Sequence, residues 1–370
     1  MQRIELPALR PLEALTLALR RLYEQYGYAP YSMTHMEEYA FYMENRNFLD
    51  QPEIAVFSDL DGRLMALKPD VTLSIARSIP PGGAELRRLY YAENVFRPSA
   101  QAGGFRELSQ MGLECIGPVT EYAAAEVAFL AERSLAATGR DYALELSHLD
   151  LLGALLEELA PPPGALAALR ACVKQKNAHD LAQLAGEAGL SAAGTERLLA
   201  LVSAPGTVDG ALRAARRAAG DNAAMRRAAD ALDRLCGALE SAHTRIEFSI
   251  VSDTAYYNGV ALRGYVEGAP MPVLRGGEYG KLLARLGKGA QRAIGFALYL
   301  GELARCLPEP EPDGGGTLLL YDAADAPAHV RAAAARLVAE GARVTALTEA
   351  PPGARFARVV RLEREEEVPC

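Results

Sequence analysis

The feature that most constrains the fold is the stretch from Arg88 to Gly117, because it encodes two strands and the turn that joins them. It reads RLYYAENVFRPSAQAGGFRELSQMGLECIG. An apolar strand pattern runs up to Arg97, glycines follow at the turn, and a second strand pattern carries Gln110 and Glu114. The stretch therefore predicts a hairpin, and a sheet that contains it.

The segments around this hairpin add helices and further short strands. Residues 9–26 place apolar side chains at helical spacing, and Gly27 stands where such a helix would end. Residues 54–67 predict a second hairpin, with Asp61 and Gly62 at its turn. Further patterns follow in the order helix, strand, helix, over residues 122–138, 142–146 and from Leu149. This order predicts an α+β fold around a mainly antiparallel sheet.

The second half of the chain changes character twice. Residues 160–243 are rich in Ala, Leu and Arg and contain Pro and Gly turn signals, which predicts a helical insertion. Strands are then expected at 245–253 and 256–268, a turn and short helix at 276–287, and a core helix over AIGFALYLGELARCL, residues 293–307.

These patterns predict three parts along the chain. The first is a core over residues 1–306, with the helical insertion at about 160–243. A linker rich in Pro, Gly and acidic residues follows at 307–316. The last is a small α/β domain at 317–370, with a helix at 327–340 that Gly341 ends.

Composition excludes several classes of protein. The apolar runs are broken well short of the roughly 20 residues that a membrane span needs, and the first residues lack an apolar signal core, so we expect a cytoplasmic protein without membrane contact. Five cysteines without CxxC spacing predict neither a disulfide framework nor a metal site. A net charge of -8 argues against a surface built for nucleic acid. No cofactor is predicted.

The hairpin resembles motif 2 of the class II aminoacyl-tRNA synthetases, in the form found in histidyl-tRNA synthetase. Segments that match this family follow one another in the same order between about residues 20 and 305. They are EQYGYAPYSMTHMEE for motif 1, FSDLDGRLMALKPDVT, AYYNG, GGEYG, and GFALYLGEL for motif 3. The resemblance implies a class II synthetase-like core and self-association as a dimer through motif 1, although Thr34 stands where that motif has proline.

The resemblance also implies a pocket for free L-histidine. Asp70 stands where the family has a glutamate beside the α-ammonium, and Thr72 and Gln110 complete that cradle. The motif 2 arginine, Arg97, would face the carboxylate, and the positions that hold the imidazole are Glu114, Tyr257 and Tyr279. Each residue alone has an ordinary structural alternative, namely core packing for Tyr279, a paired strand carboxylate for Glu114 and turn formation after Pro69 for Asp70.

The residues that handle ATP in the synthetase are replaced. Ser252 stands at the position of an activating arginine, Glu302 at that of the motif 3 arginine, and Ser99 and Ala100 where motif 2 has ERP. A reversed charge about 5 Å from a phosphate, at an effective dielectric near 20, changes the interaction by roughly 6 kcal/mol. We therefore predict no catalytic residues.

A histidine pocket without activating residues resembles the regulatory-subunit family of ATP phosphoribosyltransferase, which is related to the synthetase. That family implies a non-catalytic subunit of histidine biosynthesis, which assembles with the short-form catalytic subunit, activates it and takes part in feedback inhibition by histidine. Two alternatives stay open, a divergent histidyl-tRNA synthetase and a synthetase-like module that senses tRNA. Histidine binding at a subunit interface also stays open.

Overall fold

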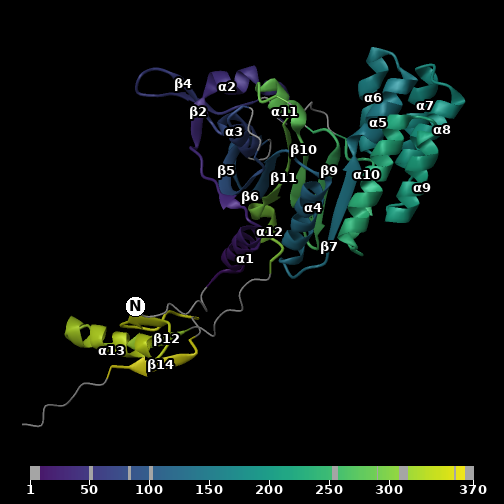
Figure 1. Ribbon diagram of the computed structural model, residues 1–370. Coiled ribbons are helices and arrows are strands. Elements are labelled where there is room, and N and C mark those ends of the chain that lie inside the picture. The colour runs from purple at the N-terminus through teal and green to yellow at the C-terminus, as the bar shows by residue number, and fades with distance from the viewer. Residues whose placement is uncertain are drawn as a thin grey trace, which may run out of the picture. The chain divides into compact units, whose positions relative to one another are not determined.

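The structure is a computed structural model, and it describes most of the chain (Figure 1). The described residues are 9–49, 53–81, 85–99, 103–251, 257–289, 291–307, 316–353 and 356–362. The contacts between residues divide the chain into two compact units, Met1–Leu307 and Pro308–Cys370. Each unit is described by itself.

The first unit is built on a sheet to which eight described strands contribute. Their order is β1-β5-β6-β11-β10-β9-β7-β8. The outermost pairs, β1 with β5 and β7 with β8, are parallel, and every pair between them is antiparallel. The strands are β1 Ala29–Pro30, β5 Arg87–Ser99, β6 Gly104–Gly117, β7 Tyr142–His148, β8 Thr244–Ile246, β9 Val260–Val266, β10 Leu274–Glu278 and β11 Arg292–Tyr299. The mainly antiparallel sheet, with its hairpin β5–β6, confirms the predicted fold class.

Helices cover both faces of this sheet. On one face lie α1 Pro11–Gln25, α4 Glu121–Ala136 and α12 Leu300–Ala304, which share a core with the inward side chains of β6 and β11. On the other lie α2 Tyr39–Glu44, the 3-10 turn Arg46–Phe48, α3 Val71–Ser78 and α11 Gly280–Arg285, with a second core. A small antiparallel sheet, β2 Met36–Glu38, β4 Leu64–Leu67 and β3 Val56–Ser58, adjoins this side.

The first helix shows how local sequence sets these elements. Leu15, Leu19 and Tyr23 are buried at helical spacing. At its start the backbone N–H of Arg10 donates to Glu13 Oε2 at 2.8 Å. Just past its end Gly27 has φ +77°, a left-handed conformation that glycine adopts without strain.

Two expected elements differ from the structure. The core helix predicted over residues 293–307 is wrong for most of its length, because Arg292–Tyr299 is strand β11 and only Leu300–Ala304 is helical. β11 lies in the middle of the sheet and is buried on both faces, so its sequence is a continuous apolar run without alternation. The strand predicted over 245–253 is shortened to β8, Thr244–Ile246; Ser252 and Asp253 lie outside the described residues.

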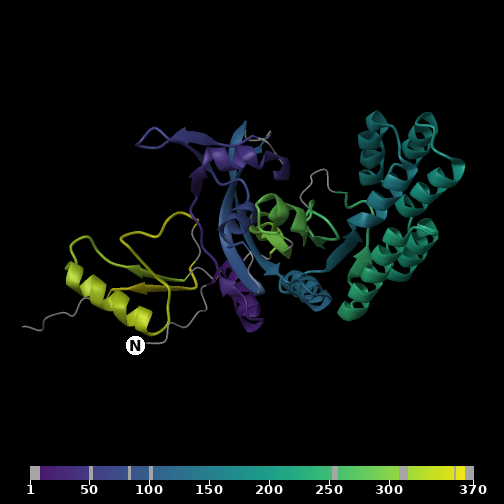
Figure 2. The same cartoon turned by 45° about the horizontal axis from the view of Figure 1, so that its top comes forward.

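The helical insertion follows β7 and returns to the sheet at β8. It contains α5 Leu149–Leu159, α6 Pro163–Lys174, α7 Ala178–Glu187, α8 Ala192–Val202, α9 Val208–Ala219 and α10 Ala223–Leu239. Figures 1 and 2 show these helices gathered beside the β7–β8 edge of the sheet. The insertion packs there because α10 contacts β7 and α4, and α9 contacts β8.

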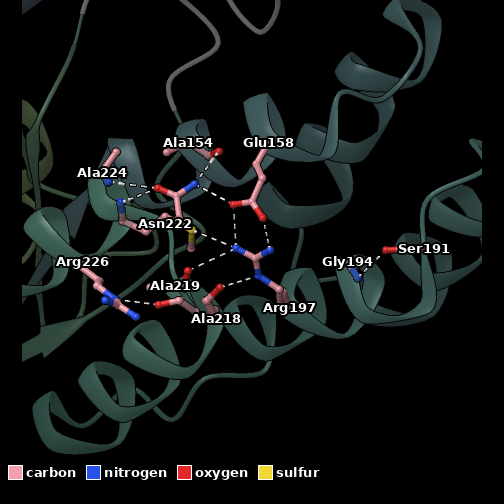
Figure 3. Close-up of polar contacts among 12 residues, drawn as sticks. Ala154, Glu158, Ser191, Gly194, Arg197, Ala218, Ala219, Asn222, Ala224 and Arg226 are labelled. Carbon is pink, nitrogen blue, oxygen red and sulfur yellow. Dashed lines mark hydrogen bonds and ion pairs between the residues drawn. The ribbon is translucent and has the colours of Figure 1, made fainter.

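A polar cluster joins four helices of the insertion (Figure 3). Arg197 of α8 forms a double hydrogen-bonded ion pair with Glu158 of α5, and its Nε donates to the Ala218 carbonyl at the end of α9 at 2.6 Å. Asn222 accepts from two backbone N–H groups at the start of α10 and donates to Glu158 Oε2 at 2.7 Å. Because the cation also faces the negative end of the α9 dipole, Arg197 is the centre of the cluster.

We expect Arg197→Ala to lower the free energy of unfolding by about 2 kcal/mol, because it leaves Glu158 and the α9 carbonyls without their charged donor. Urea denaturation measures the loss. The control is Arg213→Ala on the exposed face of α9, expected within about 0.5 kcal/mol of wild type. Equal losses in the two variants would contradict the assignment.

Acid should weaken the same cluster. Hydrogen bonds from Arg197 and Asn222 lower the pKa of Glu158 to about 2. Since this pKa lies below its unfolded value, the contribution of Glu158 to stability is present above pH 4.5 and is lost as the pH falls toward 2.

The second unit is a small parallel α/β structure. Its described elements are β12 Thr317–Leu320, α13 Pro327–Ala339, β13 Val344–Leu347 and β14 Arg358–Arg361, with the sheet order β13-β12-β14. Leu319, Ala333 and Leu337 form its core. Gly341, with φ +86°, follows α13. Among all the described helices, none is long and apolar enough to span a membrane.

Candidate functional site

A cavity of about 740 Å³ lies in the first unit, on the sheet face that carries α3 and α11. All seven residues predicted for the histidine pocket line it: Asp70, Thr72, Arg97, Gln110, Glu114, Tyr257 and Tyr279. They come from separate places in the fold, namely the start of α3, the hairpin β5–β6, the segment before β9, and the end of β10. The sheet register is what brings them together.

The sheet forms the floor of the cavity, and small residues on neighbouring strands leave space there. Ala261, Gly277 and Gly295 stand side by side on β9, β10 and β11, and the next partner in this row is Glu114 on β6. A Cβ atom on Gly295 would overlap both the Glu114 carboxylate and the Leu113 carbonyl oxygen. Gly295 therefore gives the Glu114 side chain the space that it occupies.

Glu114 is a buried carboxyl group held by two hydroxyl groups. Thr72 Oγ1 donates to its Oε1 and the Tyr279 hydroxyl donates to its Oε2, both at 2.6 Å. Only 2 % of the residue is exposed. Burial raises the pKa of Glu114 to about 8, assisted by the nearby Asp70 and opposed by the two hydrogen bonds. The carboxyl group is therefore protonated near neutral pH.

Asp70 and Arg97 form the polar corner of the cavity at the start of α3. Asp70 is the N-cap of α3, and its Oδ1 accepts from the Leu73 backbone N–H at 2.7 Å. Its Oδ2 lies 3.6 Å from Arg97 Nη2, and Arg97 Nε donates to the Pro69 carbonyl at 3.1 Å. The arginine from β5 and the start of α3 are thus fixed to each other.

The two remaining predicted residues complete the walls. Gln110 on β6 is buried, and its side chain makes no hydrogen bond within the described part of the chain, so its amide is available to a ligand. Tyr257 is half-buried, and its ring lies over Gly277, where an added Cβ would approach the ring to 3.0 Å. An amide group and an aromatic ring therefore complete the lining of the cavity.

A buried ion pair, which was not predicted, supports this corner of the cavity. Lys68 Nζ lies 2.7 Å from Glu93 Oε2, and the lysine side chain is fully buried. Glu93 Oε1 also accepts from the Met33 backbone N–H at 3.2 Å. Because the Phe96 N–H donates to the Lys68 carbonyl, the segment that ends at Asp70 is tied to β5 from two sides.

The positions predicted to have lost ATP chemistry are described in part. Glu302 lines the cavity and lies 3.2 Å from Arg305 Nη1. Ser99 ends β5, whereas Ala100 and Ser252 lie outside the described residues. Within the part that the structure describes, no group of His, Cys, Asp and Glu side chains could hold a metal ion.

Sequence reasoning missed several basic residues of the cavity. Arg106, Arg263 and Arg275 all line it. Arg263 follows Ala261 by two residues on β9, so strand alternation places both on one face. This alternation was visible in the sequence, but only the sheet register shows which face of the sheet carries the cavity.

Comparison with known proteins gives consistent matches. The sequence model of the family "Histidyl-tRNA synthetase" matches residues 2–303. The "ATP phosphoribosyltransferase regulatory subunit" of Moorella thermoacetica is 33% identical over 329 residues, which are 85% of this chain and 82% of that protein.

Solved structures match the fold. An "ATP phosphoribosyltransferase regulatory subunit/histidyl-tRNA synthetase" from Bacillus halodurans has a TM-score of 0.79 at 24% identity, and the match covers 95% of this chain and 93% of that one. A chain of the "ATP phosphoribosyl transferase (HisG:HisZ) complex" from Thermotoga maritima has a TM-score of 0.60 at 17% identity, and the match covers 78% of this chain and 96% of that one.

Proposed function

Because this chain belongs to the histidyl-tRNA synthetase-like family of ATP phosphoribosyltransferase regulatory subunits, we propose that it regulates the first step of histidine biosynthesis without catalysing it. The proposed partner is the short-form catalytic subunit, and the proposed effector is L-histidine. The Thermotoga maritima protein of similar fold is itself part of a complex, which supports the assembly.

The arrangement around Glu114 carries the histidine proposal. An imidazole ring beside the hydrogen-bonded Glu114 and Tyr279 would meet a carboxyl group that can give or accept a proton, in a place closed to water. The α-ammonium would then lie near Asp70 and Gln110, and the carboxylate near Arg97. A site that satisfies all three polar groups of free histidine discriminates against isosteres that lack them.

The lack of catalysis is proposed from the nucleotide side of the cavity. Glu302, a carboxylate paired with Arg305, stands where the synthetase has its motif 3 arginine, so the cation that contacts the nucleotide phosphates in that family is missing at this position. Removal of even one preorganised donor to a transition state typically costs about 10² to 10³ in rate. Adenylate formation is therefore not expected.

Regulation follows from linkage in the proposed assembly. Histidine inhibits if it binds the inactive assembly more tightly than the active one, with a coupling free energy of typically 1 to 3 kcal/mol. We place self-association as a dimer in the synthetase-like core. We place the assembly in the cytoplasm, since the four described cysteines are free and buried, as is usual in a reducing compartment.

The test is calorimetric titration of L-histidine into the chain, followed by titration with the short-form catalytic subunit from the same organism. We expect histidine binding, association with the catalytic subunit, and no histidine-dependent pyrophosphate exchange. Exchange above background would instead establish a working synthetase. Histidine binding without any effect of the chain on phosphoribosyltransferase activity would refute the regulatory role while it leaves the pocket intact.

The pH dependence of histidine binding tests the role of Glu114. Free imidazole has a pKa of about 6.5, and the pKa of Glu114 is raised to about 8 in the empty cavity. Between these values free ligand and protein together hold one proton, and the bound imidazolium–carboxylate pair also holds one, so affinity should be flat. Below pH 6.5 binding must release a proton, and affinity should fall as the pH falls.

Calorimetry in buffers of different ionisation enthalpy measures these protons directly. Near neutral pH we expect no net proton uptake, whereas an ionised Glu114 in the empty cavity would require uptake of nearly one proton. Glu114→Gln removes the charge but keeps the shape, and we expect it to weaken histidine binding by about 30- to 100-fold.

A further inference from the structure

The cavity contains two pairs of arginines that face each other across neighbouring strands. Arg263 on β9 is the register partner of Arg275 on β10, and Arg97 on β5 is the partner of Arg106 on β6. All four residues line the cavity. Like charges directly opposite each other in a sheet are destabilising, so such pairs are expected only where something compensates the charge.

The Arg263–Arg275 pair is compensated on one side only. Arg263 contacts Glu145 on β7 at 2.8 and 2.9 Å, and its guanidinium lies 5.6 Å from the ring centre of Tyr265. Arg275 is exposed and makes no hydrogen bond or ion pair with any described residue. Its partner on the other side is Ala297 of β11, which brings no charge. In the part of the chain that the structure describes, the two cations therefore have one contacting carboxylate between them, and it pairs with Arg263 alone.

We propose that Arg263 and Arg275 form a binding subsite for a small phosphate-bearing ligand at the β9–β10 side of the cavity. A guanidinium is planar, permanently charged and suited to bidentate hydrogen bonds with phosphate oxygens. A phosphate carries up to two negative charges, which balances the pair more fully than a single carboxylate does. The ligand would supply the charge that the sheet lacks in this row.

This subsite is separate from the Glu114 cradle. Glu114 lies on β6 and Arg275 on β10, with β11 between them, so their backbones are roughly 10 Å apart at the usual strand spacing. The other carboxylates of the cavity are engaged elsewhere, Asp70 with Arg97, Glu107 with Asn94 and Glu302 with Arg305. A cavity of about 740 Å³ is within the size range of sites for ligands larger than an amino acid.

The test does not depend on histidine and is made in its absence. Inorganic phosphate and, separately, adenosine monophosphate are titrated into the full chain by calorimetry, in a chloride buffer of low ionic strength near neutral pH. Arg275→Gln removes the exposed cation, and Arg275→Lys keeps the charge but not the planar guanidinium. Arg87→Gln is the control, at an exposed arginine of β5 outside the cavity.

We expect saturable binding that Arg275→Gln weakens at least tenfold, Arg275→Lys weakens less, and Arg87→Gln leaves within twofold. Binding of both probes would identify free phosphate as sufficient, and binding of the nucleotide alone would identify a phosphate ester. The proposal is overturned if neither probe saturates at millimolar concentration, or if Arg275→Gln binds like wild type. Equal urea midpoints would show that the variants are folded, as expected for an exposed side chain.

Discussion

Replacement of Lys68 by methionine is expected to lower the free energy of unfolding by about 3 to 5 kcal/mol. The ammonium group is fully buried and lies 2.7 Å from Glu93 Oε2. Methionine keeps most of the apolar volume, so the loss comes mainly from the Glu93 charge, which is left buried without its partner. Urea denaturation followed by circular dichroism measures the change.

A second substitution separates charge from packing. Glu93→Gln removes the buried charge and keeps an oxygen that can accept from the Met33 N–H, so Lys68→Met with Glu93→Gln should recover at least half of the loss. Lys281→Met, at an exposed lysine of α11, is the matched control and should change stability by less than about 0.5 kcal/mol. A double variant as unstable as the sum of its parts would show that the ion pair is not the cause.

Gly295→Ala is expected to abolish measurable histidine binding and to cost about 3 kcal/mol of stability. The added methyl group would overlap the Leu113 carbonyl oxygen, which belongs to the backbone of β6 and cannot turn aside. It would also overlap the Glu114 carboxylate and displace it from Thr72 and Tyr279. Calorimetry with histidine and urea denaturation measure the two effects.

Gly301→Ala is the control for this variant. Gly301 also lines the cavity, but it lies in α12 and an added Cβ meets no other atom within 4 Å. Alanine is the better helix former, so stability should be unchanged or slightly higher and histidine binding should be retained. Normal histidine affinity in Gly295→Ala would mean that histidine does not bind beside Glu114.

The fold class followed from the sequence where the periodicity was clear. Helix α1 and the hairpin β5–β6 lie where their patterns predicted them, because each has one buried face and an unambiguous turn. β11 was predicted as a helix, since a central strand covered on both faces has no polar face to mark its period. Burial by other elements is a property of the whole fold and cannot be deduced from a short apolar run.

The sequence predicted those residues of the cavity to which the matched motifs assign a binding position. Asp70, Glu114 and Tyr279 were expected together from the motif frame, and they line one cavity. Arg275 and the Lys68–Glu93 pair were not expected, because their significance depends on which residues stand opposite them in the fold. Local sequence specifies the strands, whereas register decides which charges meet.

Asp70 has a further consequence for how this pocket can change. Its carboxyl group begins helix α3 and also faces Arg97 in the cavity, so one side chain carries a structural and a recognition role. The related synthetase has glutamate at this position, a residue that is not favoured as an N-cap. A longer acid would extend further toward a bound ammonium but would leave the Leu73 N–H without its acceptor. Selection for tighter effector binding here is therefore opposed by selection for the helix itself.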